Sequence, residues 1–259
     1  MTNTPQFPPI PAPISGASPF YGKSIELAES KDFNNALTAI NEAIRMEPEE
    51  INFYNYRGFI YYNLNEFQQA VNSYDFCINL NPNNRDFWNN RNLALAKCKD
   101  TTSLELGCGI HHKNPFDASA SYGIDIREDL DAKILKADLT VEPIPFPDNY
   151  FDFVVAEHFL EHIPRLIYAP THRFPFIDLM SEIYRVLKPR GLFYSITPAY
   201  PHPEAFQDPT HVNIITDKTL AAYFCYAIPW ARQYGFKGQF NFSKQDWEGP
   251  CLRSWINKM

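Results

Sequence analysis

The sequence predicts an all-α repeat domain followed by an α/β domain, in which helices cover both faces of a mostly parallel sheet. Large side chains recur every 34 residues in the first part, as at Phe20, Tyr54 and Trp88, which indicates a helical repeat. Apolar runs alternate with helical patterns in the second part, which is typical of βαβ units. There the run Ser103–Gly109 ends in a glycine turn, and Asp125 ends the next apolar run. This arrangement suits the binding of a nucleoside.

Composition excludes several other classes of protein. The 259 residues are 45% apolar and carry a net charge of −7, so we expect a packed core and no nucleic-acid partner. The five cysteines show no C-x-x-C spacing, which favours reduced thiols in a cytoplasmic protein. We find neither a signal peptide nor an apolar run of the roughly 18–20 residues that span a bilayer, so no membrane span is expected. Residues 1–16 are rich in proline and are expected to form a mobile leader.

The repeat signal covers residues 17–98, which hold two repeats and one capping helix. Small residues match across the repeats as well as large ones, since Ala36 corresponds to Ala70. Pro48 and Pro82 follow the second helix of each repeat, where no further helical N–H is needed. In this register the segment resembles the tetratricopeptide repeat.

Three interpretations of the repeats remain open: coincidental helical spacing, a peptide-binding groove, or a brace for the second domain. Chaperone-binding members of the family hold a peptide carboxylate with a basic clamp. Here Tyr21 and Asn55 stand where the first clamp lysine is expected, which argues against that partner. A glycan or a neutral peptide suits the expected inner face better, because its positions are rich in asparagine and aromatic residues: Asn52, Asn55, Tyr56, Phe59, Tyr62, Asn89, Asn90 and Leu93.

The second domain is expected at residues 101–259. It begins so soon after the last repeat helix that we expect the two domains to touch. Strands are expected at 103–106, 121–125, 134–137, 151–156 and 192–197. Helices are expected at 127–133, from about 158, and at 176–187. Ligands of such sheets lie at the carboxyl ends of the strands.

Five segments of this domain occur in the order and at the spacings of a known family: LELGCG, YGIDI, ADL, IPFPDNYFDFVVAEHFLEHI and YRVLKPRGLFYSITP. They resemble the class I S-adenosylmethionine-dependent methyltransferases, in particular the methyltransferase type 11 group, which have a Rossmann-like fold. The resemblance is strong over residues 101–199 and looser over 200–259. It implies S-adenosylmethionine as the cofactor.

The resemblance also implies a role for each matching residue. Glu105 would orient the glycine turn and reach the methionine amine through water, while Gly107 and Gly109 would let the backbone approach the methionyl part. Asp125 would accept from both ribose hydroxyls. The other implied cofactor contacts are Ile126, next to Asp125; Asp138, for the adenine amino group; Leu139, at the adenine edge; and Glu157 and His158, near the methyl group or methionine.

Two features depart from the family pattern. Only twelve residues separate Gly109 from Tyr122, so we expect a loop at 111–115 beside the cofactor where a helix is usual. Arg190 replaces a common glycine, which affects local geometry only. A nicotinamide-dinucleotide dehydrogenase is the rival interpretation of the turn. The third glycine of its motif and a pyrophosphate-binding helix start are missing.

The segment His158–His162 matches the H-x-x-E-H pattern of inverted zinc proteases, in which two histidines on one helix share a metal. The same residues are common in the methyltransferase family without a metal, and spacing identifies no third ligand. We therefore expect no metal. His162 is interpreted as a structural or substrate-side residue, with a catalytic base as the alternative.

Residues 200–213 form the predicted acceptor site. Methyl transfer is an in-line displacement, in which the protein positions the nucleophile and a base assists a hydroxyl or an ammonium. Asp208 stands three residues before His211 and is expected to orient its imidazole as that base. The alternative is a hydrogen-bonded loop that closes over the cofactor. The expected acceptor contacts are Tyr200, His202 and Gln207.

The sequence therefore predicts a methyltransferase that acts on an oxygen or nitrogen of a small-molecule or glycan acceptor. The rival is a scaffold, in which the repeats recruit a protein partner and the methyltransferase fold is inactive or methylates that partner. Four late aromatic residues are interpreted as core packing, with an acceptor pocket as the alternative: Trp230, Tyr234, Phe236 and Trp247.

Overall fold

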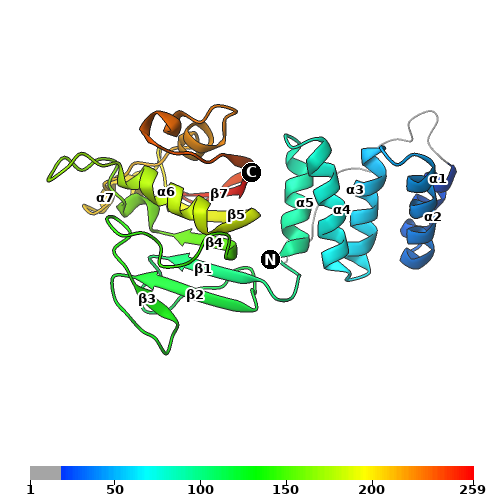
Figure 1. Ribbon diagram of the computed structural model, residues 1–259, viewed down its shortest axis with the longest axis horizontal. Coiled ribbons are helices and arrows are strands. Elements are labelled where there is room, and N and C mark those ends of the chain that lie inside the picture. The colour runs from blue at the N-terminus through cyan, green and yellow to red at the C-terminus, as the bar shows by residue number, and fades with distance from the viewer. Residues whose placement is uncertain (1–18) are drawn as a thin grey trace. The chain divides into compact units, whose positions relative to one another are not determined.

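The computed structural model describes residues 19–259, so the leader predicted at 1–16 lies outside the described part. The chain divides into two compact units, of which the first ends at Cys98 and the second comprises Lys99–Met259 (Figure 1). Within the described residues, no helix combines the length and the apolar character needed to cross a bilayer.

Consecutive helices make up the described part of the first unit, as predicted for an all-α repeat domain (Figure 1). Asp32 and Glu50 cap two of these helices, and each side chain accepts a hydrogen bond from a backbone N–H of the first turn. The helices are α1 (Pro19–Glu29), α2 (Phe33–Met46), α3 (Ile51–Asn63), α4 (Phe67–Leu80) and α5 (Arg85–Leu95).

The 34-residue period appears as equivalent hydrogen bonds. The Tyr54 hydroxyl donates to the carbonyl of Pro48 at 2.8 Å. The indole N–H of Trp88 donates to the carbonyl of Pro82, also at 2.8 Å. Each large side chain therefore secures the turn that precedes its own helix. This is the physical reason for the recurring large residue and proline in the sequence.

The second unit is built on a seven-stranded sheet with the strand order β3-β2-β1-β4-β5-β7-β6. The first five strands are parallel, and β7 runs antiparallel to both β5 and β6. The strand order reverses between β1 and β4, and this is where doubly wound sheets bind ligands. The strands are β1 (Thr102–Leu106), β2 (Ala120–Asp125), β3 (Ile134–Lys136), β4 (Phe151–Glu157), β5 (Leu187–Pro198), β6 (Phe240–Glu248) and β7 (Cys251–Lys258).

Helix α6 (Pro175–Val186) presents an apolar side to the core of the second unit. Met180, Ile183 and Val186 recur at helical spacing and are fully buried. Near its end, the Arg185 guanidinium donates to the carbonyls of Ile144 and Phe146, each at 2.8 Å. The helix thus covers the sheet and also holds the segment that leads into β4.

Two expected helices are absent. The segment predicted as a helix at 127–133 is a turn, which an antiparallel β-bridge between Asp129 and Ile134 closes. The Asp129 carboxylate accepts the N–H of Ala132 within this turn, and too few residues remain for a helix. The helix expected from about 158 is reduced to the 3₁₀ turn Leu160–His162. Pro164 explains this, because the residue before a proline avoids the α conformation.

Short elements that the sequence did not predict connect β5 to β6. They are the helix α7 (Glu204–Gln207), a π-helical turn η2 (Ala221–Cys225) and a 3₁₀ turn η3 (Trp230–Tyr234). Strand β5 also begins earlier than expected, at Leu187, and contains an irregularity with Arg190 at φ +62°.

Candidate active site

The turn after β1 is built from two glycines in the left-handed region. Gly107 has φ +63° and Gly109 has φ +67°, conformations that residues with a Cβ rarely adopt. A Cβ on Gly107 would lie 2.2 Å from the ring of Phe159. The backbone of the turn therefore lies so close to the Phe159 ring that only glycine fits at position 107. A nucleoside-binding turn needs this open backbone, so the residues present fit the implied cofactor.

Asp125 joins the end of β2 to this turn. Its Oδ2 accepts the backbone N–H of Gly109 at 2.9 Å, and its Oδ1 accepts the N–H and the Nε–H of Arg127 at 3.1 and 2.8 Å. Burial raises the pKa of Asp125, but the bonds from Arg127 and Gly109 outweigh this effect and hold the pKa below its usual value. The site thus contains an acceptor whose ionised form is favoured.

A carboxylate offers about four acceptor positions, and these three donors leave roughly one for a ribose. The Arg127 side chain is 63% exposed, so it is free to withdraw and release a second position. Ile126 is also exposed and offers an apolar surface next to the acid. The end of β2 therefore combines the polar and apolar contacts that a nucleoside requires.

Glu105 lies buried in β1, and its carboxylate accepts the backbone N–H of Lys113. The Lys113 ammonium pairs with Glu157 at the end of β4. As predicted, the segment after the turn is a loop, and it brings this lysine over the ends of two neighbouring strands. A role for Lys113 was not predicted from the sequence. One sequence feature indicated it: a basic residue stands in the loop that replaces the usual helix.

The predicted adenine contacts follow β3. Asp138 is exposed, and its Oδ1 accepts the N–H of Thr140 at 3.0 Å, while Leu139 beside it is buried. His158 follows β4 with φ +51°, and its Nδ1 lies 3.7 Å from Oε1 of Glu161. These residues lie at the carboxyl ends of their strands, as the implied roles require.

In the acceptor loop, Asp208 does not orient His211 as the catalytic base in the way that the sequence predicted. His211 Nε2 lies 4.0 Å from Asp208 Oδ2, too far for a hydrogen bond. Asp208 Oδ1 instead accepts the backbone N–H and the hydroxyl of Thr210 at 2.8 and 2.7 Å. The Thr210 hydroxyl and carbonyl lie 3.0 and 3.2 Å from His162 Nδ1. Asp208 therefore orients His162 through Thr210 and does not orient His211.

The two histidines nevertheless lie together, because the rings of His162 and His211 are 5.0 Å apart. Among the expected acceptor contacts, Tyr200 and Gln207 are exposed, and the ring of His202 lies 5.0 Å from that of Trp247. None of these three expected contacts lines the cavity described next.

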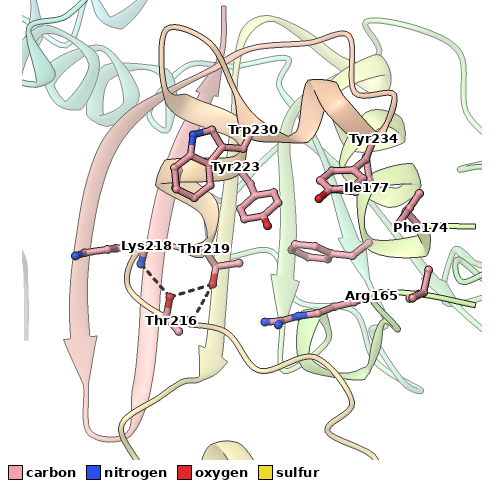
Figure 2. Close-up of a pocket in the computed structure, with 12 residues that line it drawn as sticks. Arg165, Phe174, Ile177, Thr216, Lys218, Thr219, Tyr223, Trp230 and Tyr234 are labelled. Atoms are coloured by element: carbon pink, nitrogen blue, oxygen red, sulfur yellow. Dashed lines mark hydrogen bonds between the residues drawn. The ribbon is translucent and has the colours of Figure 1, made fainter.

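A cavity of about 490 Å³ lies between the segment that follows β4 and the connection from β5 to β6. In Figure 2 the rings of Tyr223, Trp230 and Tyr234 lie above the Arg165 guanidinium. The lining is mostly aromatic and apolar, with a few polar groups, which is typical of small-molecule sites. It consists of Arg165, Leu166, Phe174, Phe176, Ile177, Thr216, Lys218, Thr219, Ala222, Tyr223, Trp230 and Tyr234.

This cavity changes the interpretation of the late aromatic residues. Trp230 and Tyr234 line it, whereas Phe236 is buried in the core as expected. Arg165 is held in place because its Nε donates to Asn213 Oδ1 at 2.6 Å. Segments far apart in the sequence form this cavity, so no local motif predicts it.

Comparison with known proteins identifies the class of the second unit. The family model described as a methyltransferase domain matches residues 104–195. Residues 104–195 of the second unit are therefore a methyltransferase domain, whereas the described part of the first unit is a series of five helices.

Solved structures similar to parts of the chain belong to the same two classes. A methyltransferase from Aquifex aeolicus is 16% identical over 62% of this chain and 84% of its own, with a TM-score of 0.42. One from Archaeoglobus fulgidus is 20% identical over 62% and 86%, with a TM-score of 0.39. The Sgt2 TPR domain from Aspergillus fumigatus is 15% identical over 33% and 57%, with a TM-score of 0.31. No curated protein matches the chain significantly.

Proposed function

We propose that the second unit binds S-adenosylmethionine at the carboxyl ends of β1 and β2 and methylates an oxygen or nitrogen of a small-molecule or glycan acceptor. The observation that carries this proposal is Asp125, an ionised carboxylate bonded directly to the turn of Gly107 and Gly109. The cofactor supplies an electrophilic methyl group on a sulfonium, which the acceptor atom displaces in line.

The residues of the chain then have three tasks. Asp125 holds the ribose hydroxyls, and Glu105 offers a negative charge to the methionine ammonium. Asp138 and Leu139 receive the adenine. On the acceptor side, the aromatic cavity near Arg165 orients the substrate, because sugar rings and aromatic metabolites pack on flat side chains.

The cavity also favours the acceptor class. Arg165 and Lys218 supply positive charge within an aromatic lining, so a sugar or an aromatic metabolite that carries an acidic group fits it best. Within this proposal His162 is the base candidate nearest to a fixed orientation, because Thr210 and Asp208 hold its ring.

Calorimetry with S-adenosylmethionine and S-adenosylhomocysteine tests the cofactor site. We expect Asp125→Asn to weaken binding about 100-fold, while Asp131→Asn, an exposed acid between β2 and β3, leaves it unchanged. Equal affinity of the two variants would contradict the ribose assignment.

The acceptor class is tested by incubating the protein with methyl-labelled S-adenosylmethionine and a fractionated cell extract. We expect label in the small-molecule or glycan fraction, and reduced transfer by Trp230→Ala with unchanged cofactor affinity. Label confined to the protein fraction would instead support the rival, in which the repeats deliver a protein substrate. A partner captured equally well by Asp125→Asn would support a scaffold.

A further inference from the structure

A cluster of one glutamate and two histidines lies beside the cofactor site. Glu161 and His162 follow β4, and His211 follows β5. One ligand-type atom from each of them lies within 4.8 Å of the other two. Thr197, near the end of β5, donates its hydroxyl to Glu161 Oε2 at 2.7 Å. The cluster thus occupies the carboxyl edge of the sheet between β4 and β5.

Two atoms of this cluster are buried and lack a hydrogen-bond partner: Oε1 of Glu161 and Nδ1 of His211. Glu161 is 1% exposed, and the His211 side chain is 9% exposed. A buried polar atom without a partner costs roughly 1–3 kcal/mol, and more when it is charged. The cluster therefore contains two buried polar atoms whose hydrogen-bonding capacity is unused within the described residues.

The third residue, His162, is prepared in a specific tautomer. The Thr210 hydroxyl has one proton, and it donates that proton to Asp208 Oδ1 at 2.7 Å. Nδ1 of His162 must then be the donor toward Thr210. Its Nε2 consequently carries a lone pair. A hydrogen bond from one ring nitrogen to a carbonyl or hydroxyl is how proteins orient metal-binding histidines.

We propose that Glu161, His162 and His211 bind a divalent first-row transition metal such as Zn²⁺ or Mn²⁺. Two imidazoles and one carboxylate suit these ions, and three protein ligands leave a coordination position open. Bonds of about 2.0–2.2 Å place neighbouring ligand atoms roughly 3.3 Å apart, so binding draws the three side chains inward by about an ångström. Sequence spacing does not reveal this site because its third ligand, His211, comes from a distant loop.

The alternative partner for Glu161 is a protonated His158. Its Nδ1 lies 3.7 Å from Glu161 Oε1, close enough for an ion pair but too far for a hydrogen bond. This contact leaves the Nδ1 atom of His211 without any partner. A metal accounts for both atoms, and a charged His158 accounts for only one.

The role of the metal rests on the proposed function, and the metal replaces His162 as the activating group because the Nε2 lone pair then binds the ion. A hydroxyl of the acceptor would occupy the open position, and the ion would lower its pKa. The hydroxyl proton would pass to solvent, and the oxygen would take the methyl group as the bond from that carbon to sulfur breaks. Metal binding itself needs neither cofactor nor acceptor, so it is tested separately from methyl transfer.

The test is calorimetric titration of the full chain, freed of metal by chelation, with Zn²⁺ and Mn²⁺. We expect one equivalent to bind. Glu161→Gln and His211→Gln should each weaken binding about 100-fold, and Thr210→Val about 10-fold through the lost orientation of His162. His172→Gln removes an exposed histidine outside the cluster and should bind as the wild type does.

A second measurement tests the proposal even if a variant of a metal-binding residue fails to fold. Wild-type protein loaded with Co²⁺ should show visible absorption typical of nitrogen and oxygen ligands, and one equivalent of Zn²⁺ should remove it. The absence of stoichiometric binding to the wild type would overturn the proposal. Wild-type affinity in a folded Glu161→Gln or His211→Gln variant would overturn it as well. If metal binds but no methyl transfer occurs, the metal site stands and the proposed function fails.

Discussion

At the residue scale, Glu105 links protonation to the stability of the second unit. Burial raises its pKa to about 7 from an ordinary value of 4.5, although the N–H of Lys113 partly opposes this effect. Because the pKa is higher in the folded state, the neutral carboxyl is favoured there. The stabilisation is complete below about pH 4.5 and is lost as the pH rises through about 7.

We therefore expect Glu105→Gln to be more stable than the wild type near pH 8, by up to about 3 kcal/mol, and equal to it near pH 4.5. Denaturant unfolding across this range measures the difference. Cofactor affinity should rise with pH in the wild type as the carboxylate forms, and this dependence should disappear in the variant. Parallel pH profiles for the two proteins would refute the assignment.

Gly107 tests how closely the turn approaches its neighbours. Gly107→Ala adds a left-handed strain of about 1–2 kcal/mol and a clash with Phe159 of about 1–3 kcal/mol. Gly249→Ala is the matched control, since φ is +58° there and no atom lies within 4 Å. We expect the first variant to lose more stability in thermal unfolding and to bind the cofactor more weakly. Equal losses would show that the contact with Phe159 is unimportant.

At the element scale, the packing of α3 against α4 depends on Gly58. A Cβ there would lie 2.6 Å from the ring of Tyr74, which is fully buried. We expect Gly58→Ala to destabilise the repeats by about 1–3 kcal/mol. Gly22 lies in α1 with open space around it, so Gly22→Ala should stabilise by up to about 1 kcal/mol through helix propensity. Circular dichroism during denaturation distinguishes these opposite signs, and a gain at both positions would contradict the proposed packing.

Elements were predictable where apolar periodicity is strong and the chain is unconstrained. The strands that end in Leu106 and Asp125 follow from short apolar runs, and α6 follows from its amphipathic pattern. The helix expected from about 158 failed because Pro164 interrupts it. The segment at 127–133 failed because a side-chain cap closes a turn. Such competition between local hydrogen bonds and helix formation is hard to rank from sequence alone.

At the scale of the whole molecule, the two units have separate cores. Among the described residues, the clusters that contain Ile40 and Ile183 share no member. Ile40→Ala should cost about 2–5 kcal/mol in the first unit and leave cofactor affinity unchanged. Ile183→Ala, at an equally buried position in the second unit, should lower both stability and affinity. Unfolding followed by calorimetry measures each effect, and weaker cofactor binding by Ile40→Ala would show that the units depend on each other.

Local sequence patterns were sufficient to predict the two classes of fold, and they also locate the turn that is proposed to bind the cofactor. The repeat period, the strand ends and the residues from Glu105 to Asp125 are local patterns. Their hydrogen bonds join residues that are close in the chain or lie on neighbouring strands. The residues proposed to surround the acceptor come together only through tertiary packing. The Glu161, His162 and His211 cluster and the aromatic cavity are each assembled from segments on either side of β5. At Asp208 the spacing predicted a hydrogen bond with the histidine three residues away. The carboxylate instead accepts the hydroxyl of Thr210, which is the nearer donor. Contacts between loops depend on packing, and a linear pattern does not record them.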